Sequence, residues 1–183
     1  MKLVQKNLFE ECNKEIWYQL VFLESRLILL NEDQLMRKPG EGGWSIAECL
    51  EHLNSYLYYY LPYLQKSLSN TNLHTETKHF TPSIPGSLMF YLIDPKRKLK
   101  KWNALPKHHP NVISGKKSLM SHIKLQNEFK QLIDDYKSIS TNQKNIPLSL
   151  APFVKLNSGD IIQFITFHNQ RHYKQIVQMM ELG

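Results

Sequence analysis

The sequence predicts an all-α protein, a four-helix bundle with a long crossover between its second and third helices. Four stretches of the 183-residue chain repeat apolar side chains every three or four positions, as helices that bury one face do. No stretch of useful length alternates apolar and polar residues in the manner of a strand. Four amphipathic helices bury their apolar faces against one another, so we expect residues 1–183 to form one bundle domain.

The first predicted helix covers about residues 3–30 and the second about residues 46–68. The first carries an apolar stripe at Phe9, Cys12, Ile16, Leu20, Leu23, Leu27 and Leu30. The second begins in WSIAECLEHL, where Ser45 and Glu48 have the spacing of a capping box. Pro62 lies inside this helix, so we expect a kink or an early end there.

The third predicted helix covers about residues 118–139 and the fourth about residues 161–180, with Asn157 or Ser158 as its N-terminal cap. Residues 69–117, between the second and third helices, contain five prolines and predict a long loop that is functional or mobile. A connection of this length allows the second and third helices to run parallel.

Composition limits the compartment and the partners. No apolar run approaches the roughly 20 residues that span a bilayer, and the N-terminus turns acidic too early for a signal peptide, so we expect a cytoplasmic protein without a membrane partner.

Cys12 and Cys49 fall on apolar helical positions and are expected to be buried free thiols. The net charge of +7 includes one dense basic cluster, PKRKLKKW, at residues 95–102. No nucleic-acid-binding motif accompanies it, so we expect a solvated loop and no nucleic-acid partner.

Two histidines occupy the middle of the fourth apolar stripe, within FHNQRHYKQI. His168 and His172 are four residues apart, so a helix places both imidazoles on one face, about 5–6 Å apart at Cβ. Imidazoles at this spacing can converge on one metal ion. The HxxxH pattern also arises by chance, and histidines bonded to backbone or water are the alternative. The central position in the stripe favours metal, because burying two unpartnered imidazoles is costly.

A metal site of two imidazoles needs a third ligand from another helix. His52 lies beside the stripe of the second helix, and His122 lies in line with the stripe of the third. Helical periodicity does not choose between these two histidines. Glu48 and Cys49 could also reach a metal, although a capping role and a core role suit them better.

Two motifs, GWSIAECLEHL and FHNQRHYKQI, resemble the DinB-like superfamily, which includes the YfiT-type metal-dependent hydrolases. The order of the long helices and the long second crossover agree with the bundle of that family. The resemblance implies a divalent metal ion, nickel or zinc, held by His52, His168 and His172. It leaves His122 as a pocket or supporting residue. Three protein ligands leave coordination positions open for water or substrate.

The resemblance also implies a metal-dependent hydrolase or a thiol-dependent transferase that acts on a small molecule, with a low-molecular-weight thiol as one candidate. No catalytic residue is assigned, because Glu51 is expected to point away from the stripe and Glu48 to cap the helix. This argues against hydrolysis more than against metal binding. The alternative is a non-catalytic metal- or ligand-binding module of the stress response. The resemblance and the amphipathic helices favour a homodimer.

Overall fold

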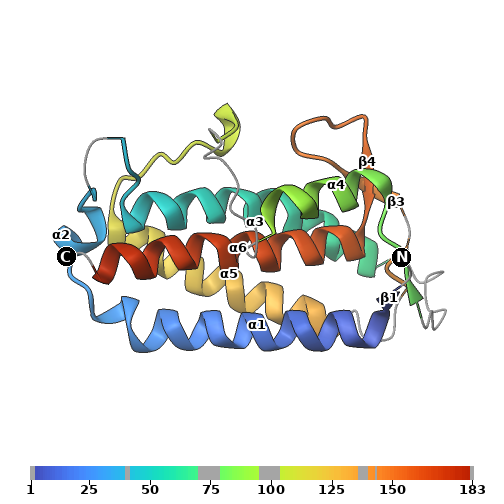
Figure 1. Cartoon of the computed structure of the whole chain (residues 1–183), viewed down its shortest axis with the longest axis horizontal. Coiled ribbons are helices and arrows are strands. Elements are labelled where there is room, and N and C mark those ends of the chain that lie inside the picture. Colours follow the sequence, from blue (N-terminus) through green and yellow to red (C-terminus); the bar gives the residue numbers. More distant parts are fainter. Residues whose placement is uncertain are drawn as a thin grey trace.

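Four long helices dominate the computed structural model, which describes residues 3–39, 42–69, 79–94, 104–135, 140–142 and 144–181. They are α1 (Gln5–Ser25), α3 (Ile46–Leu68), α5 (Gly115–Asp135) and α6 (Ser158–Glu181). The four helices lie side by side, and α5 and α6 each pack against both α1 and α3 (Figure 1). The prediction of an all-α fold is confirmed.

The first helix ends earlier than predicted, at Ser25, and a 3-10 turn, η1 (Leu27–Leu29), follows it. A short helix, α2 (Glu32–Met36), then packs against α3 and α5. The Glu32 carboxylate accepts hydrogen bonds from the backbone N–H groups of Gly115 at 2.6 Å and Lys116 at 3.0 Å, which lowers its pKa. These N–H groups are unpaired at a helix start, so Glu32 caps α5 from a distant part of the chain.

The start of α3 has the predicted capping box. The Ser45 hydroxyl accepts a hydrogen bond from the Glu48 N–H at 3.1 Å, and the Glu48 carboxylate accepts one from the Ser45 N–H at 2.8 Å. The expected early end at Pro62 is wrong, because α3 continues through it to Leu68. Pro62 lies on the exposed face, and the buried Leu61 beside it packs into the core. Tertiary packing thus outweighs the one backbone hydrogen bond that proline removes.

The connection between α3 and α5 contains a helix that the sequence analysis missed, α4 (Ile84–Ile93), which packs against α6. The Ser83 hydroxyl caps α4 by accepting from the Gly86 N–H at 3.0 Å. The buried Asp160 carboxylate accepts from the Ser83 hydroxyl at 2.6 Å and from its N–H at 3.1 Å. Asp160 therefore fastens α4 to the start of α6. The basic cluster at residues 95–102 lies outside the described residues.

Two short antiparallel sheets were also not predicted. In one, β1 (Leu3–Val4) pairs with β2 (His79–Phe80), and in the other β3 (Lys144–Pro147) pairs with β4 (Lys155–Asn157). Strands this short carry too few residues for an alternating pattern to be visible. At the last residue of β4, the Asn157 side chain accepts a hydrogen bond from the Asp160 N–H at 2.7 Å, so Asn157 is the cap of α6.

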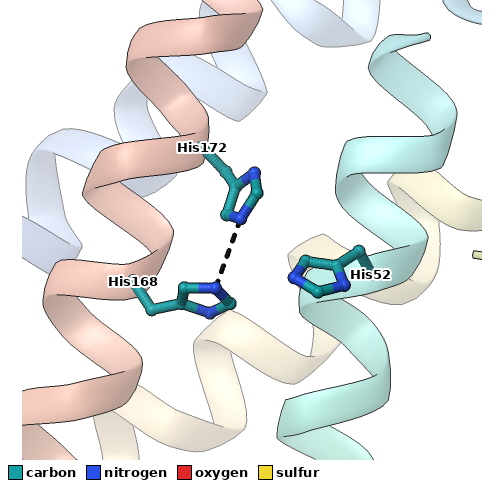
Figure 2. Close-up of side chains that lie close together, drawn as sticks. All are labelled: His52, His168 and His172. Carbon is teal, nitrogen blue, oxygen red and sulfur yellow. Dashed lines mark hydrogen bonds between the residues drawn. The ribbon is translucent and has the colours of Figure 1, made fainter. Parts of the chain in front are cut away.

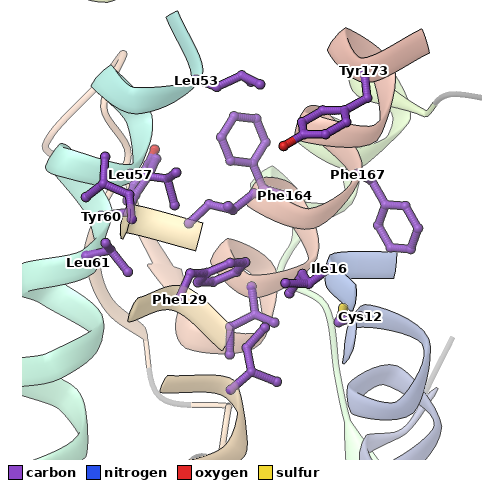
Figure 3. Packing of buried hydrophobic residues seen from close by; sticks show 14 of the residues in the cluster. Cys12, Ile16, Leu53, Leu57, Tyr60, Leu61, Phe129, Phe164, Phe167 and Tyr173 are labelled. Carbon is purple, nitrogen blue, oxygen red and sulfur yellow. The ribbon is translucent and has the colours of Figure 1, made fainter. Parts of the chain in front are cut away.

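The core lies between the long helices, where aromatic and aliphatic side chains from all four meet (Figure 3). Cys12 and Cys49 are buried free thiols, as predicted, and burial raises the pKa of each to about 12. No helix in the described ranges is both long and apolar enough to cross a membrane.

Candidate metal centre

The neighbouring helices α3 and α6 bring three of the predicted residues together. His52 projects from α3, and His168 and His172 project from consecutive turns of α6 toward it (Figure 2). All three imidazoles are buried, and their candidate ligand nitrogens lie within 4.8 Å of one another. The structure thus assembles a group of three histidines, hereafter the triad, that could hold a metal ion.

The two α6 histidines face each other through the same ring atom. The Nε2 atoms of His168 and His172 are 3.2 Å apart. Two nitrogens bound to one tetrahedral zinc ion at about 2.0–2.1 Å would be roughly 3.3 Å apart. The pair therefore already has a separation suited to one ion. For one Nε2 to donate to the other it must carry a proton, and that proton has to leave Nε2 before both atoms can bind metal.

The main-chain oxygen of His108 determines which ring nitrogen of His52 carries the proton. The Nδ1 atom of His52 lies 2.7 Å from this oxygen. A carbonyl oxygen only accepts hydrogen bonds, so Nδ1 carries the proton and Nε2 keeps its lone pair. A backbone carbonyl in this position is a common partner of metal-binding histidines, because it fixes both the tautomer and the ring orientation.

Burial keeps the triad neutral. It lowers the pKa of His52 to about 4, although the hydrogen bond to the His108 carbonyl acts in the opposite direction. Burial, reinforced by the nearby His52 and opposed by Gln175, lowers the pKa of His172 to about 3. The pKa of His168 is held well below its usual value, chiefly by burial and by the adjacent His172. At neutral pH the three rings therefore offer lone pairs rather than positive charges, which is the state that binds metal.

Aromatic rings surround the triad. Trp44 stacks on His172 with ring centroids 6.1 Å apart, and Phe164 stacks on His168 at 5.0 Å. Tyr56 meets His52 and His168 edge-on, at 5.2 and 4.9 Å. These contacts restrict the orientation of the imidazoles and exclude water from their sides. Trp44 and Tyr56 are only partly buried, so they form the outer rim of the site.

His122, the other candidate third ligand, does not join the triad. It is fully buried, with Nδ1 2.7 Å from the Asn54 side-chain oxygen and Nε2 3.1 Å from the Tyr173 hydroxyl. Both ring nitrogens are therefore engaged by protein groups, and His122 is a core histidine whose polarity is satisfied.

The acidic residues near the triad in sequence are engaged elsewhere. Glu48 caps α3 and pairs with Lys38 at 3.0 Å. Glu51 accepts a hydrogen bond from the Ser118 hydroxyl at 2.9 Å. Cys49 stays protonated at neutral pH, because burial raises its pKa to about 12. Among the described residues, the group that could hold a metal thus consists of histidines alone.

A comparison with protein families settles the relationship of the chain. The family model described as the DinB superfamily matches residues 23–176, which include the whole triad. The chain belongs to the DinB superfamily. No curated protein and no solved structure matches it. The DinB assignment therefore supports the all-α fold, and it leaves the reaction open.

In this DinB-superfamily chain, two surface grooves lie away from the triad. One, of about 410 Å³, runs between α1 and α6 past Phe22 and Tyr173. The other, of about 300 Å³, involves α1, α4 and α6 near Tyr18 and Phe167. None of the three histidines lines either groove.

His108 was not predicted as a site residue from the sequence, although its carbonyl oxygen contacts a triad residue. His108 lies in η3 (Pro106–His108), 56 positions from His52, and no spacing rule relates the two. The only available signal was the pair of histidines between prolines in PKHHP.

Proposed function

We propose that this DinB-superfamily protein is a divalent-metal-dependent enzyme acting on a small molecule, with His52, His168 and His172 as the metal ligands. The observation that carries the proposal is the 3.2 Å separation of the two α6 Nε2 atoms, with a ligand nitrogen of His52 within 4.8 Å of them. Neutral imidazoles suit nickel and zinc among the common divalent ions, which makes these two the proposed metals.

The donor set favours a catalytic rather than a purely structural ion. Structural zinc sites are usually closed by four protein ligands, whereas three protein ligands leave a position for water or substrate. A bound ion would act as a Lewis acid that lowers the pKa of a bound water or thiol. The chain itself supplies three uncharged ligands, a backbone carbonyl that orients one of them, and aromatic side walls.

Thiol-dependent transfer is the better supported of the two reaction types. Water activation is usually assisted by a general base, but Glu48 and Glu51 are engaged in the capping box and by Ser118. A thiol needs less help, because its ordinary pKa of about 8.5 is far below that of water. We therefore favour a low-molecular-weight thiol as co-substrate, with hydrolysis as the other reaction to be assayed.

Metal analysis of the purified protein tests this function directly. We expect about one bound nickel or zinc ion per chain, and activity that depends on it. His172→Ala should lose the ion, because it removes one of the two facing Nε2 atoms. His109→Ala is the matched control, since it removes an exposed imidazole 6.2 Å from the Trp44 ring but outside the triad. A wild-type protein that binds neither metal would refute the proposal.

A non-catalytic metal- or ligand-binding module is the second candidate. It is favoured by the engagement of Glu48 in the capping box and of Glu51 by Ser118, which leaves neither carboxylate as a general base. In this case metal should raise the melting temperature of the protein by binding the folded state. Thiol-transfer and hydrolysis assays of the same metal-loaded sample should then show no turnover.

A further inference from the structure

His108 and a single turn of α3 hold each other in place. The His108 carbonyl oxygen accepts the hydrogen bond from His52 Nδ1. The His108 side chain in turn contacts Ser55 and Tyr56, which follow His52 by three and four positions on the same helix face. On the next turn of α3 the Tyr59 ring meets the His108 ring edge-on, with centroids 6.2 Å apart. One residue of the connection between α4 and α5 is therefore engaged by four α3 side chains.

The hydrogen bonds around Ser55 define the protonation of His108. The Ser55 hydroxyl donates to the His52 main-chain oxygen at 2.6 Å, and its oxygen lies 2.9 Å from His108 Nδ1. A hydroxyl has one hydrogen, which is already used in the first bond, so His108 Nδ1 is the donor in the second. The imidazole of His108 is thereby anchored to α3 by a directional bond.

Packing adds to this anchor. The His108 ring stacks on Tyr56 with centroids 3.7 Å apart and planes 18° apart, and the residue is only 2% exposed. The His108 N–H donates to the Leu105 oxygen at 2.8 Å, which closes the turn. The Lys107 ammonium lies over the Tyr59 ring, 4.1 Å from its centroid. The position of the His108 carbonyl is thus fixed by contacts on both sides of the turn.

We propose that His108 is a positioning residue of the metal centre, whose side chain, seated on Ser55 and Tyr56, holds its carbonyl oxygen against His52 Nδ1. This keeps the proton of His52 on Nδ1 and leaves Nε2 free to bind metal together with His168 and His172. Without the carbonyl, His52 would be free to place its proton on Nε2, where it blocks a ligand. The inference rests on the proposed function, because it assigns His108 a role in the same site.

The test combines metal affinity with the tautomer of His52. Ser55→Ala and His108→Ala remove the two halves of the side-chain anchor and keep the His108 carbonyl in the chain. Loss of a partner that orients a ligand typically weakens metal binding about 10–100-fold, so we expect that loss of Zn²⁺ affinity in both variants, measured by competition with a chromophoric chelator. The stoichiometry should stay unchanged, because all three ligands remain. His109→Ala should bind Zn²⁺ as the wild type does.

Nitrogen-15 NMR of the imidazoles in the metal-free protein gives a second readout that a merely structural role would not change. The wild type should show His52 with its proton on Nδ1, and the anchor variants should show a mixture of tautomers. If His108→Ala does not fold, the result for Ser55→Ala alone tests the proposal. Wild-type affinity and an unchanged His52 tautomer in Ser55→Ala would overturn the proposal. A wild type that binds neither Zn²⁺ nor Ni²⁺ but has the Nδ1–H tautomer would refute the proposed function and leave the orientation of His52 by His108 standing.

Discussion

His122 and the pair formed by His168 and His172 are buried in the same bundle, but the hydrogen-bond partners of their ring nitrogens differ. Each nitrogen of His122 has a protein partner, Asn54 on one side and Tyr173 on the other. In the α6 pair the Nε2 atoms contact only each other among the described hydrogen bonds, and neither Nδ1 has a partner there.

This difference separates a structural histidine from a candidate ligand better than burial does. Burial lowers the pKa of His122 and of His172 to about the same value, 3. Buried polar groups are nearly always hydrogen-bonded to other protein groups, so two buried Nε2 atoms that contact only each other call for an explanation such as an ion. The two groups are therefore expected to respond differently to metal, to substitution and to pH.

The largest expected difference is in stabilisation by metal. A ligand present at 100 to 1,000 times its dissociation constant stabilises a folded protein by about 2.7–4.1 kcal/mol. We expect zinc or nickel to raise the free energy of unfolding by this order in the wild type and in His122→Leu. In the double variant His168→Leu/His172→Leu the same addition should have no effect. Urea unfolding with and without metal measures all three. An equal response of the double variant and the wild type would contradict a role for the pair as ligands.

The second difference concerns the metal-free protein. His122→Leu leaves the Asn54 side chain and the Tyr173 hydroxyl without their imidazole partner inside the core. A buried polar group that loses its partner costs about 1–3 kcal/mol, so we expect a loss of roughly 2–4 kcal/mol in the free energy of unfolding. His109→Leu, at an exposed position, serves as control and should change stability little. A metal-free His122→Leu protein as stable as the wild type would show that the two hydrogen bonds contribute nothing.

The contrast between these histidines also shows which parts of the site could be predicted from the sequence. The four-residue spacing of His168 and His172 on a helical stripe is local, so their common face was predictable. The choice between His52 and His122 depends on which faces of α3 and α5 are turned toward α6. Helical periodicity does not predict that relative rotation. The family resemblance indicated His52, and the structure places His52, and not His122, beside the α6 pair.

Elements held by long-range contacts were the ones missed. The all-α class followed from four stripes that each needed a partner. By contrast, α4 is fixed through Ser83 by Asp160, a residue 77 positions away, and the His108 turn is fixed by Ser55, 53 positions away. The early end expected at Pro62 was wrong for a related reason, since packing of the neighbouring core residues maintains the helix. Local sequence propensity cannot predict a contact with a residue that lies far away in the chain.

The third difference is in the response to acid. Unfolded histidine has a pKa of about 6.5, and burial lowers that of His122 to about 3 in the folded state. Above pH 6.5 both states are neutral and stability is complete. Between these two pKa values only the unfolded state binds the proton, so each such group lowers the free energy of unfolding by about 1.4 kcal/mol per pH unit as pH falls.

The wild type without metal should therefore lose stability from pH 6.5 downward, as several buried histidines contribute. His122→Leu should lose less per pH unit than the wild type, by the slope of one proton. Urea unfolding of both proteins at pH 7, 6 and 5 measures the two slopes. Identical slopes would mean that folding does not shift the pKa of His122.

The smallest expected effect is that of His168→Leu/His172→Leu on the metal-free protein, and its sign matters most. This change removes both members of a hydrogen-bonded pair together with two buried Nδ1 atoms that have no described partner. Replacing both partners by apolar side chains of similar size is often neutral or stabilising, so we expect a change within about 1 kcal/mol and no destabilisation. A loss like that of His122→Leu would show that the pair is held by hydrogen bonds as His122 is. A neutral result together with abolished metal binding would mean that the fold does not need these imidazoles, and that their place in the core serves the ion.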